Sequence, residues 1–185
     1  MGWLPNLITL VRIPVIIVLV LPAFSLGWDS PKLAFWAYGI GILSHGLDGA
    51  LAERLKSKTK PHGFWHKLDT EVLSLGLQLA AAAWLVHAGV LPWWIVPIYL
   101  VAALALQFAY IEPRKNAGRP FKPVVLWGSG LVWMILGVLL TYQAYQKTWY
   151  AIVTAAVLFI YMLIYANGLH PQVWNRWFDE ADGKI

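Results

Sequence analysis

Two pairs of histidine and aspartate lie at the facing ends of two neighbouring apolar segments. His45 precedes Asp48 by three residues, and His66 precedes Asp69 by the same spacing. Residues i and i+3 share one face of a helix, so each pair predicts a polar patch on a helix. An ionisable side chain at the centre of a bilayer costs about 2.5–3.5 kcal/mol, which makes such residues candidates for function. We therefore expect the two pairs to point at one another across the loop that joins the segments.

These residue types predict a site for one divalent metal. Carboxylate oxygens such as those of Asp48 and Asp69 suit hard cations such as Mg²⁺ or Mn²⁺. Imidazoles such as those of His45 and His66 suit Zn²⁺ or Fe²⁺ better, and a tetrapyrrole could take the same ligands. Two carboxylates and two imidazoles also resemble the inward-facing ligand sets of helix bundles. The residues alone leave these choices open, together with the choice that the chain holds no metal.

Small and basic residues near the pairs complete a candidate substrate-binding site. Gly49 and Ala52 carry almost no side chain, so a neighbouring helix or a ligand can approach the backbone closely there. Positive charges that could neutralise a phosphate belong to the connecting loops. They are Arg54, Arg114, Arg119 and Lys122. The general preference of basic residues for one side of a membrane accounts for the same charges without any ligand.

The composition predicts an all-α, polytopic membrane protein. The 185 residues are 59% hydrophobic and 12% charged, with a mean hydropathy of +0.61. Soluble domains carry about 25% charged residues. Because a membrane-spanning helix needs about 20 apolar residues, we expect a single membrane domain over residues 1–185, built as a bundle of six helices. The expected helices are 7–26, 33–55, 65–87, 92–111, 123–145 and 149–169, the first of them kinked at Pro14 and Pro22.

The loop charges predict the orientation of this bundle. The loop between the second and third helices and that between the fourth and fifth are rich in arginine and lysine. The opposite loops contain Lys32 and Lys147. Cytoplasmic loops carry the excess of basic residues, so we expect the His/Asp end and both termini to face the cytoplasm of a bacterial inner membrane. The net charge of +5 arises in these loops and does not indicate a nucleic-acid partner.

The motif around Asp48 resembles that of the CDP-alcohol phosphatidyltransferase family. Members of that family carry Asp-x-x-Asp-Gly-x-x-Ala-Arg, then about eight residues, then Gly-x-x-x-Asp-x-x-x-Asp. Residues 48–52 match the middle of this motif, residues 68–72 resemble the segment around its third aspartate, and residues 5–13 resemble the family's start. The resemblance implies a membrane-embedded helical fold. It also implies transfer of a phosphate-linked group from a CDP-linked donor to an alcohol, with release of CMP, at acids that hold two divalent metals.

Several positions depart from the family's motif. His45 stands where the first aspartate belongs, Glu53 where the arginine belongs, and Leu73 where the fourth aspartate belongs, the residue that takes the proton from the attacking hydroxyl. In this alignment the connector is three residues too long. If the connector keeps the family's length, His66 and Thr70 fall on the third and fourth aspartates instead. Either alignment leaves at most two of the four acids.

These departures favour a catalytically degenerate relative that acts as a lipid-binding or structural subunit of a membrane assembly. Its partners would be membrane lipids, other membrane chains, or a second copy, since homodimers are usual in the family it resembles. One alternative is an active phosphatidyltransferase of phospholipid biosynthesis with altered metal ligands. Another is a membrane protein that binds a metal or a tetrapyrrole through its His/Asp pairs. The sequence therefore leaves open whether the chain is an enzyme, and leans against it.

Overall fold

The regular secondary structure of the described part of the chain is helical. The computed structural model describes the backbone of residues 3–24, 26, 29–54, 72–106, 108–109 and 122–164. Side chains are described for residues 7–24, 26, 29–47, 72–106, 108–109 and 130–163. Over these ranges the elements are α1 (Trp3–Leu10), α2 (Arg12–Val20), the 3-10 helix η1 (Leu21–Phe24), α3 (Pro31–Arg54), α5 (Ser74–His87), α6 (Ile95–Leu106), α8 (Lys122–Tyr145) and α9 (Thr148–Ile164).

The first expected helix consists of three consecutive pieces, α1, α2 and η1. α1 ends at Leu10, because Pro14 has no N–H to donate to the Leu10 carbonyl and its ring crowds that carbonyl. The N–H of Val11 instead donates to the carbonyl of Ile8 at 3.1 Å, which tightens the backbone at the junction. Pro22 lies within η1, where the α-helix has given way to a 3-10 turn. The segment therefore runs from Trp3 to Phe24 rather than from residue 7 to residue 26.

The other helices differ from the expected bounds mainly at their ends. α3 and α8 each begin within two residues of the expected start and end within one residue of the expected end, and α9 begins at Thr148 instead of residue 149. α5 begins at Ser74, after a π-helical turn at 72–73, and residues 65–71 of the expected third helix lie outside the described part. α6 begins at Ile95 rather than residue 92, because Pro92 opens a turn in which its carbonyl accepts the N–H of Ile95 at 3.1 Å.

One helical stretch of the described chain meets the length and composition of a full membrane span. It is Leu7–Phe24, with a mean hydropathy of 2.6 over 18 residues. Shorter apolar helices cover Ser74–His87, Ile95–Leu106, Gly130–Tyr145 and Thr148–Leu163. At 1.5 Å per residue, a helix of the length of α5 is about 21 Å long, which is shorter than the roughly 30 Å hydrocarbon layer. Of the six full spans expected from the sequence, the first therefore reaches full length within the described residues.

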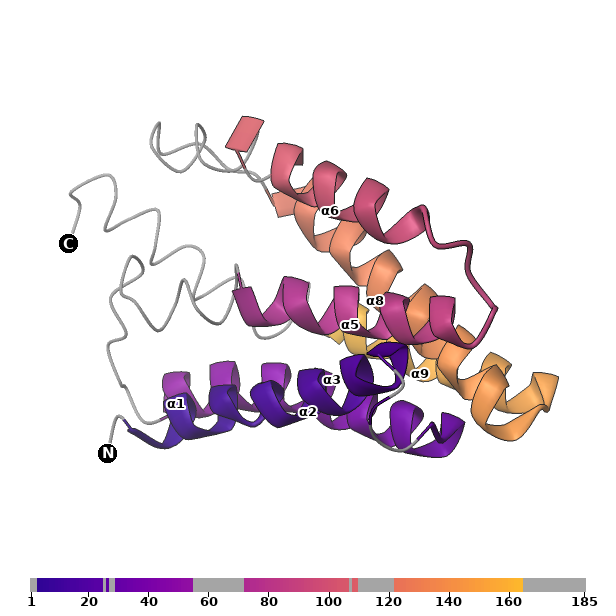
Figure 1. The fold of residues 1–185 in the computed structure, drawn as a ribbon. Helices are drawn as coiled ribbons and strands as arrows, with labels where there is room; N and C mark the ends of the chain where they lie inside the picture. The colour runs from indigo at the N-terminus through magenta and orange to yellow at the C-terminus, as the bar shows by residue number, and fades with distance from the viewer. Residues whose placement is uncertain are drawn as a thin grey trace.

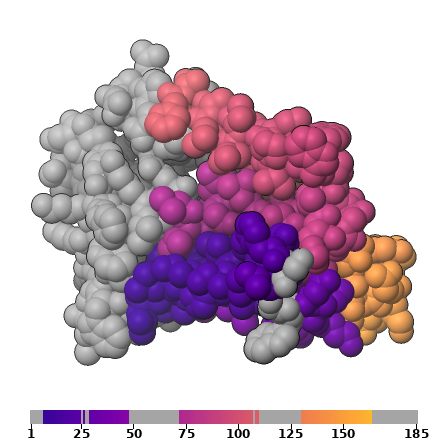
Figure 2. Space-filling view, viewed as in Figure 1, coloured from indigo at the N-terminus to yellow at the C-terminus, as the bar shows by residue number. Residues whose placement is uncertain are grey.

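α5 lies at the centre of the arrangement, between the α2–α3 pair and α6 (Figure 1). α2 packs against α3 and α5, α3 packs against α8, and α8 packs against α9. The most deeply buried apolar side chains come from these packed helices. They include Leu19, Tyr38, Leu77, Trp84 and Leu140. α6 lies at the edge, and its side chains form one outer surface of the molecule (Figure 2).

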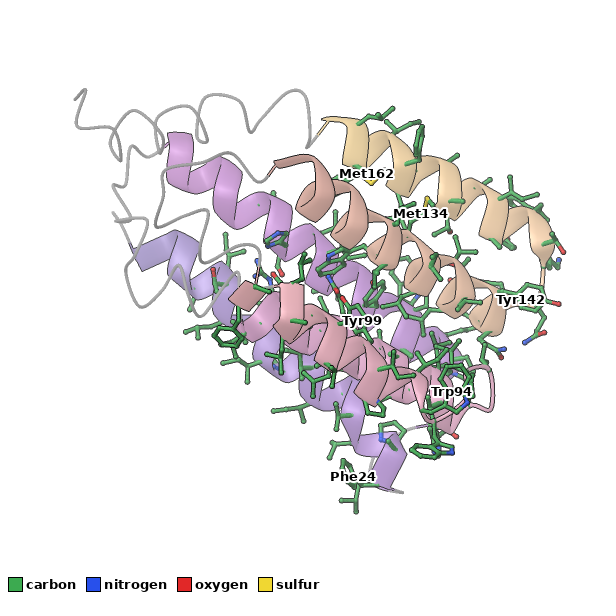
Figure 3. The ribbon with its side chains drawn as sticks, turned by 90° about the horizontal axis from the view of Figure 1, so that it is seen from above. Phe24, Trp94, Tyr99, Met134, Tyr142 and Met162 are labelled. Carbon is green, nitrogen blue, oxygen red and sulfur yellow. The ribbon has the colours of Figure 1, made fainter. Side chains whose placement is uncertain are left out.

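Two glycines of α8 let α9 approach closely. A Cβ atom built on Gly137 would lie 2.6 Å from Cδ1 of Leu158, and one built on Gly130 would meet the end of Met162. Met162 lies on α9 beside α8 (Figure 3). One turn after Gly137, the hydroxyl of Thr141 donates to that of Thr154 at 3.1 Å. Small residues of this kind are typical of helix contacts within membranes, where backbones pack closely.

Candidate functional site

The structure describes the predicted site residues to different extents. His45 lies on α3 with its side chain described, whereas Asp48, Gly49, Ala52 and Arg54 lie on the last turns of α3 with only their backbone described. Lys122 is the first residue of α8, again with only its backbone described. The remaining predicted site residues lie outside the described part. They are His66, Asp69, Arg114 and Arg119. The facing of the two His/Asp pairs therefore stays a prediction.

A fully buried arginine joins α2 to the end of α3 that carries the motif. Arg12 is completely shielded from solvent, and its Nε donates a hydrogen bond to Oγ of Ser44 at 3.2 Å. The Ser44 hydroxyl in turn donates to the carbonyl of Gly41 at 2.8 Å. Ser44 and Asp48 are four residues apart on α3, which places them on one face of the helix. Arg12 therefore reaches the face of α3 on which the sequence places the retained aspartate.

The ring of His45 packs against an aromatic residue of α8. His45 stacks on Trp133 with ring centroids 6.1 Å apart and an interplanar angle of 8°. Tyr38, two turns earlier on α3, stacks on the same indole at 5.7 Å and donates a hydrogen bond to the Trp133 carbonyl at 3.2 Å. Both contacts with the indole come from residues seven apart on α3, so they form one stripe along the helix. His45 thus forms part of the packed contact between α3 and α8.

α9 approaches the same turn of α3 through a tyrosine. Gly46 follows His45 and has no side chain, and the hydroxyl end of Tyr161 occupies the space that a Cβ there would need. The Cζ atom of Tyr161 lies 3.2 Å from that position. The absence of a side chain at Gly46 therefore lets α9 pack against this part of α3, which also contacts α2 and α8.

Leu73 lies at the start of α5 and is buried, with 5% of its surface exposed. In the alignment that retains Asp69 as the third acid, Leu73 occupies the place of the fourth. An aliphatic side chain provides no oxygen for a metal and accepts no proton. This buried position suits an aliphatic side chain, because burial of an unpaired carboxylate there would be costly.

Side chains are described at two of the four acid positions of the family's motif, in the alignment that retains Asp69. Mg²⁺ and similar ions take about six oxygen ligands, and imidazole suits softer metals. The two motif positions with described side chains, His45 and Leu73, provide no oxygen. Within the described ranges, no group of three or more His, Asp or Glu side chains is arranged to hold a metal ion.

Four residues of this region carried no expectation from the sequence. They are Arg12, Ser44, Trp133 and Tyr161. A signal for Arg12 was present, because it is the one charged residue in the apolar stretch Leu7–Phe24. A charge inside a membrane span faces the bundle interior by default. No comparable signal singles out Trp133 among twelve tryptophans.

A comparison with protein-family models agrees with the resemblance carried by the motif around Asp48. A search of curated proteins and a search of solved structures each found no match. The family model described as CDP-alcohol phosphatidyltransferase matches residues 2–179, which is nearly the whole chain. This match extends well beyond the motif, over the helices that follow it. The chain belongs to the CDP-alcohol phosphatidyltransferase family, whose members are integral membrane proteins.

Proposed function

We propose that this chain is a degenerate member of its family, which keeps the membrane fold without the standard transfer reaction. It acts instead as a lipid-binding or structural subunit of a membrane assembly, with the motif end of the bundle and both termini in the cytoplasm. The observation that carries the proposal is Leu73, a buried leucine that takes the position of the family's proton acceptor in the alignment that retains Asp69 as the third acid. Without an acceptor in reach of the attacking hydroxyl, general-base catalysis at that position is lost.

Two further substitutions support the loss of the reaction. His45 replaces the first acid and packs on Trp133, so an oxygen ligand is replaced by an aromatic ring. Glu53 stands where the family's arginine belongs and puts a negative charge where a nucleotide phosphate would need a positive one. Together with Leu73, these two changes weaken three different requirements of the transfer: the metal, the nucleotide and the base.

The surface of the described helices supports contact with lipid. Large apolar side chains are exposed along α6 and α9. They include Ile98, Val101, Leu104, Ile152, Val157 and Ile160. Exposed apolar patches of this extent mark interaction surfaces, and in an integral membrane protein they meet acyl chains or neighbouring helices.

The decisive experiment is an assay of CMP release. Purified protein in lipid nanodiscs would be mixed with CDP-linked lipids, a panel of alcohols, and Mg²⁺ or Mn²⁺. We expect no CMP above background, with Asp48→Asn and Asp69→Asn indistinguishable from the natural chain. CMP release that both substitutions abolish would overturn the proposal and establish the active transferase with altered ligands, which the retention of Asp48 and Asp69 favours.

The subunit role has its own test. The chain would be purified from its native membrane in a mild detergent, and its complexes would be identified by mass spectrometry. We expect stoichiometric lipid or other membrane chains to accompany it. A lone monomer or homodimer free of bound lipid would contradict this role. The same preparation tests the metal-binding alternative, which requires stoichiometric Zn or Fe that a His45→Ala, His66→Ala double variant loses.

A further inference from the structure

Arg12, the first residue of α2, is a buried charge within an apolar segment. None of its surface is exposed, and it lies inside Leu7–Phe24, the described helical stretch that is long and apolar enough to span a membrane. An arginine stays charged in proteins, so it cannot reduce the cost of burial by losing its proton. A buried charge is costly unless it is paired with an opposite charge and hydrogen-bonded. The position of Arg12 therefore calls for a carboxylate in addition to the neutral hydroxyl of Ser44.

The described side chains include one acid, and it lies at the other end of α3. Asp29 precedes α3, and its Oδ2 lies 3.2 Å from Nε2 of His87. Ser44, which accepts the hydrogen bond from Arg12, follows Asp29 by 15 residues. At 1.5 Å per residue this separation is about 22 Å along the helix. A carboxylate of this chain that neutralises Arg12 must therefore come from another acid.

The register of α3 distinguishes between the two acids that follow Ser44 on this helix. α3 packs beside α2 and continues to Arg54, so its backbone fixes the faces on which later residues lie (Figure 1). Asp48 follows Ser44 by four residues, which places it on the same face, about 6 Å further along the axis. Glu53 follows Ser44 by nine residues, or about two and a half turns, which places it on the opposite face. The contact of Arg12 with Ser44 therefore favours Asp48 over Glu53.

We propose that Arg12 and Asp48 form an ion pair that joins α2 to α3 inside the membrane. Ser44 positions the guanidinium for this pair, because its hydroxyl donates to the carbonyl of Gly41 at 2.8 Å and accepts the N–H of Arg12 at 3.2 Å. This inference rests on the proposed loss of the transfer reaction and deepens it. Asp48 neutralises a buried charge of the bundle, a role that needs no metal, whereas His45 on the same helix packs against α8.

A double-variant experiment tests the pair, because removing both partners of a buried ion pair is less costly than removing one. The full chain in detergent micelles would be unfolded by heat and followed by tryptophan fluorescence. Asp48→Asn leaves the guanidinium of Arg12 buried without its carboxylate and should lower the midpoint of unfolding by about 3–12 °C. Adding Arg12→Met to this variant should raise the midpoint by roughly half of that loss or more. A double variant that unfolds at or below the midpoint of Asp48→Asn would overturn the proposal.

Two other acids serve as matched controls. Glu53→Gln removes a carboxylate from the opposite face of α3, so Arg12→Met should lower the midpoint as much in this variant as in the natural chain. Asp69→Asn removes the acid of the second His/Asp pair, and Arg12→Met should not raise the midpoint of this variant either. If Arg12→Met restored the stability of Glu53→Gln or Asp69→Asn in place of Asp48→Asn, the ion pair would belong to another acid and the proposal would be overturned.

A charge-conserving variant keeps the inference falsifiable if Arg12→Met does not fold. Arg12→Lys retains the positive charge but loses the planar guanidinium that matches a carboxylate, so it should lower the midpoint in the natural chain. In the Asp48→Asn chain this carboxylate is gone, and Arg12→Lys should leave the midpoint unchanged or raise it. Equal losses in both backgrounds would refute the ion pair. CMP release would refute the degenerate transferase whatever the midpoints show, whereas equal losses without CMP release would refute the ion pair alone.

Discussion

α5 and α6 are consecutive apolar helices, yet they occupy opposite situations in the molecule. Half of the residues of Ser74–His87 are buried, namely Leu77, Gln78, Ala80, Ala81, Ala82, Trp84 and Leu85. None of the residues of Ile95–Leu106 is buried. α5 is in contact with α2, α3, α6 and α8. Among the described helices, α6 packs chiefly against α5 (Figure 1). Apolar composition therefore indicates insertion into a membrane and does not indicate burial within the protein.

The buried residues of α5 include three consecutive alanines, Ala80, Ala81 and Ala82. Alanines on several faces of α5 let other helices pack close to its backbone, which is how helices associate when lipid is equally apolar. α6 instead presents large side chains to the outside, with Val101 and Ile98 more than half exposed. Comparable substitutions in the two helices should consequently have very different effects.

The largest contrast is expected between leucines of the two helices. Leu77 of α5 is fully buried, so Leu77→Ala should lower the free energy of unfolding by about 2–5 kcal/mol, because it leaves a cavity. Leu104 of α6 is 41% exposed, and Leu104→Ala should cost well under half of that. Unfolding by denaturing detergent in bicelles measures both. Equal losses would mean that another surface covers α6.

A second contrast concerns charge inside the packed helices. Arg12→Met removes a charged hydrogen bond to buried Ser44, which should cost about 1.5–3 kcal/mol of stability. Lys32→Met, at an exposed basic residue near the start of α3, serves as the control and should change stability little. The same unfolding experiment applies. An Arg12→Met variant as stable as the natural chain would show that the buried guanidinium is replaceable by an apolar side chain of similar length.

Much of the fold could be predicted from the sequence because the apolar segments are long and the turns between them are marked. α3 and α8 have nearly the expected bounds, since Pro31 and Lys122 begin them after polar or proline-containing stretches. The division of the first segment at Val11 was expected only as a kink at Pro14. The position of α6 at the edge was not predictable, because periodicity is weak in a helix that is apolar all round.

The candidate site was predicted less completely than the fold. The spacing of His45 and Asp48 placed both on one helix, and the family match agrees with the motif that they belong to. The partners of this motif come from distant segments, Arg12 on α2 and Trp133 on α8. Such long-range contacts follow from the packing of whole helices and leave no local pattern in the sequence.

α9 resembles α6 in that many of its side chains are exposed, but one side of α9 packs closely against α8. A Cβ on Gly137 would crowd Leu158 at 2.6 Å, so Gly137→Ala should cost about 1–3 kcal/mol in spite of alanine's better helix propensity. Gly39 of α3 has nothing within 4 Å of such a Cβ, and Gly39→Ala should be neutral or stabilising by up to about 1 kcal/mol. Stability measurements should thus show a loss for Gly137→Ala and no loss for Gly39→Ala. A loss in both would point to the helix backbone rather than to the α8–α9 contact.

The smallest effect on stability is expected at the C-terminal end of α5, where the side chain of His87 meets that of Asp29. Nε2 of His87 lies 3.2 Å from Oδ2 of Asp29, which precedes α3, and the Asp29 side chain is 60% exposed. Exposed pairs of this kind contribute about 0–1 kcal/mol, so Asp29→Asn should change the free energy of unfolding by less than that. A larger loss would show that α5 depends on the contact at its C-terminal end as well as on its buried face. The distinction from α6 would then rest on this contact at the helix end in addition to packing.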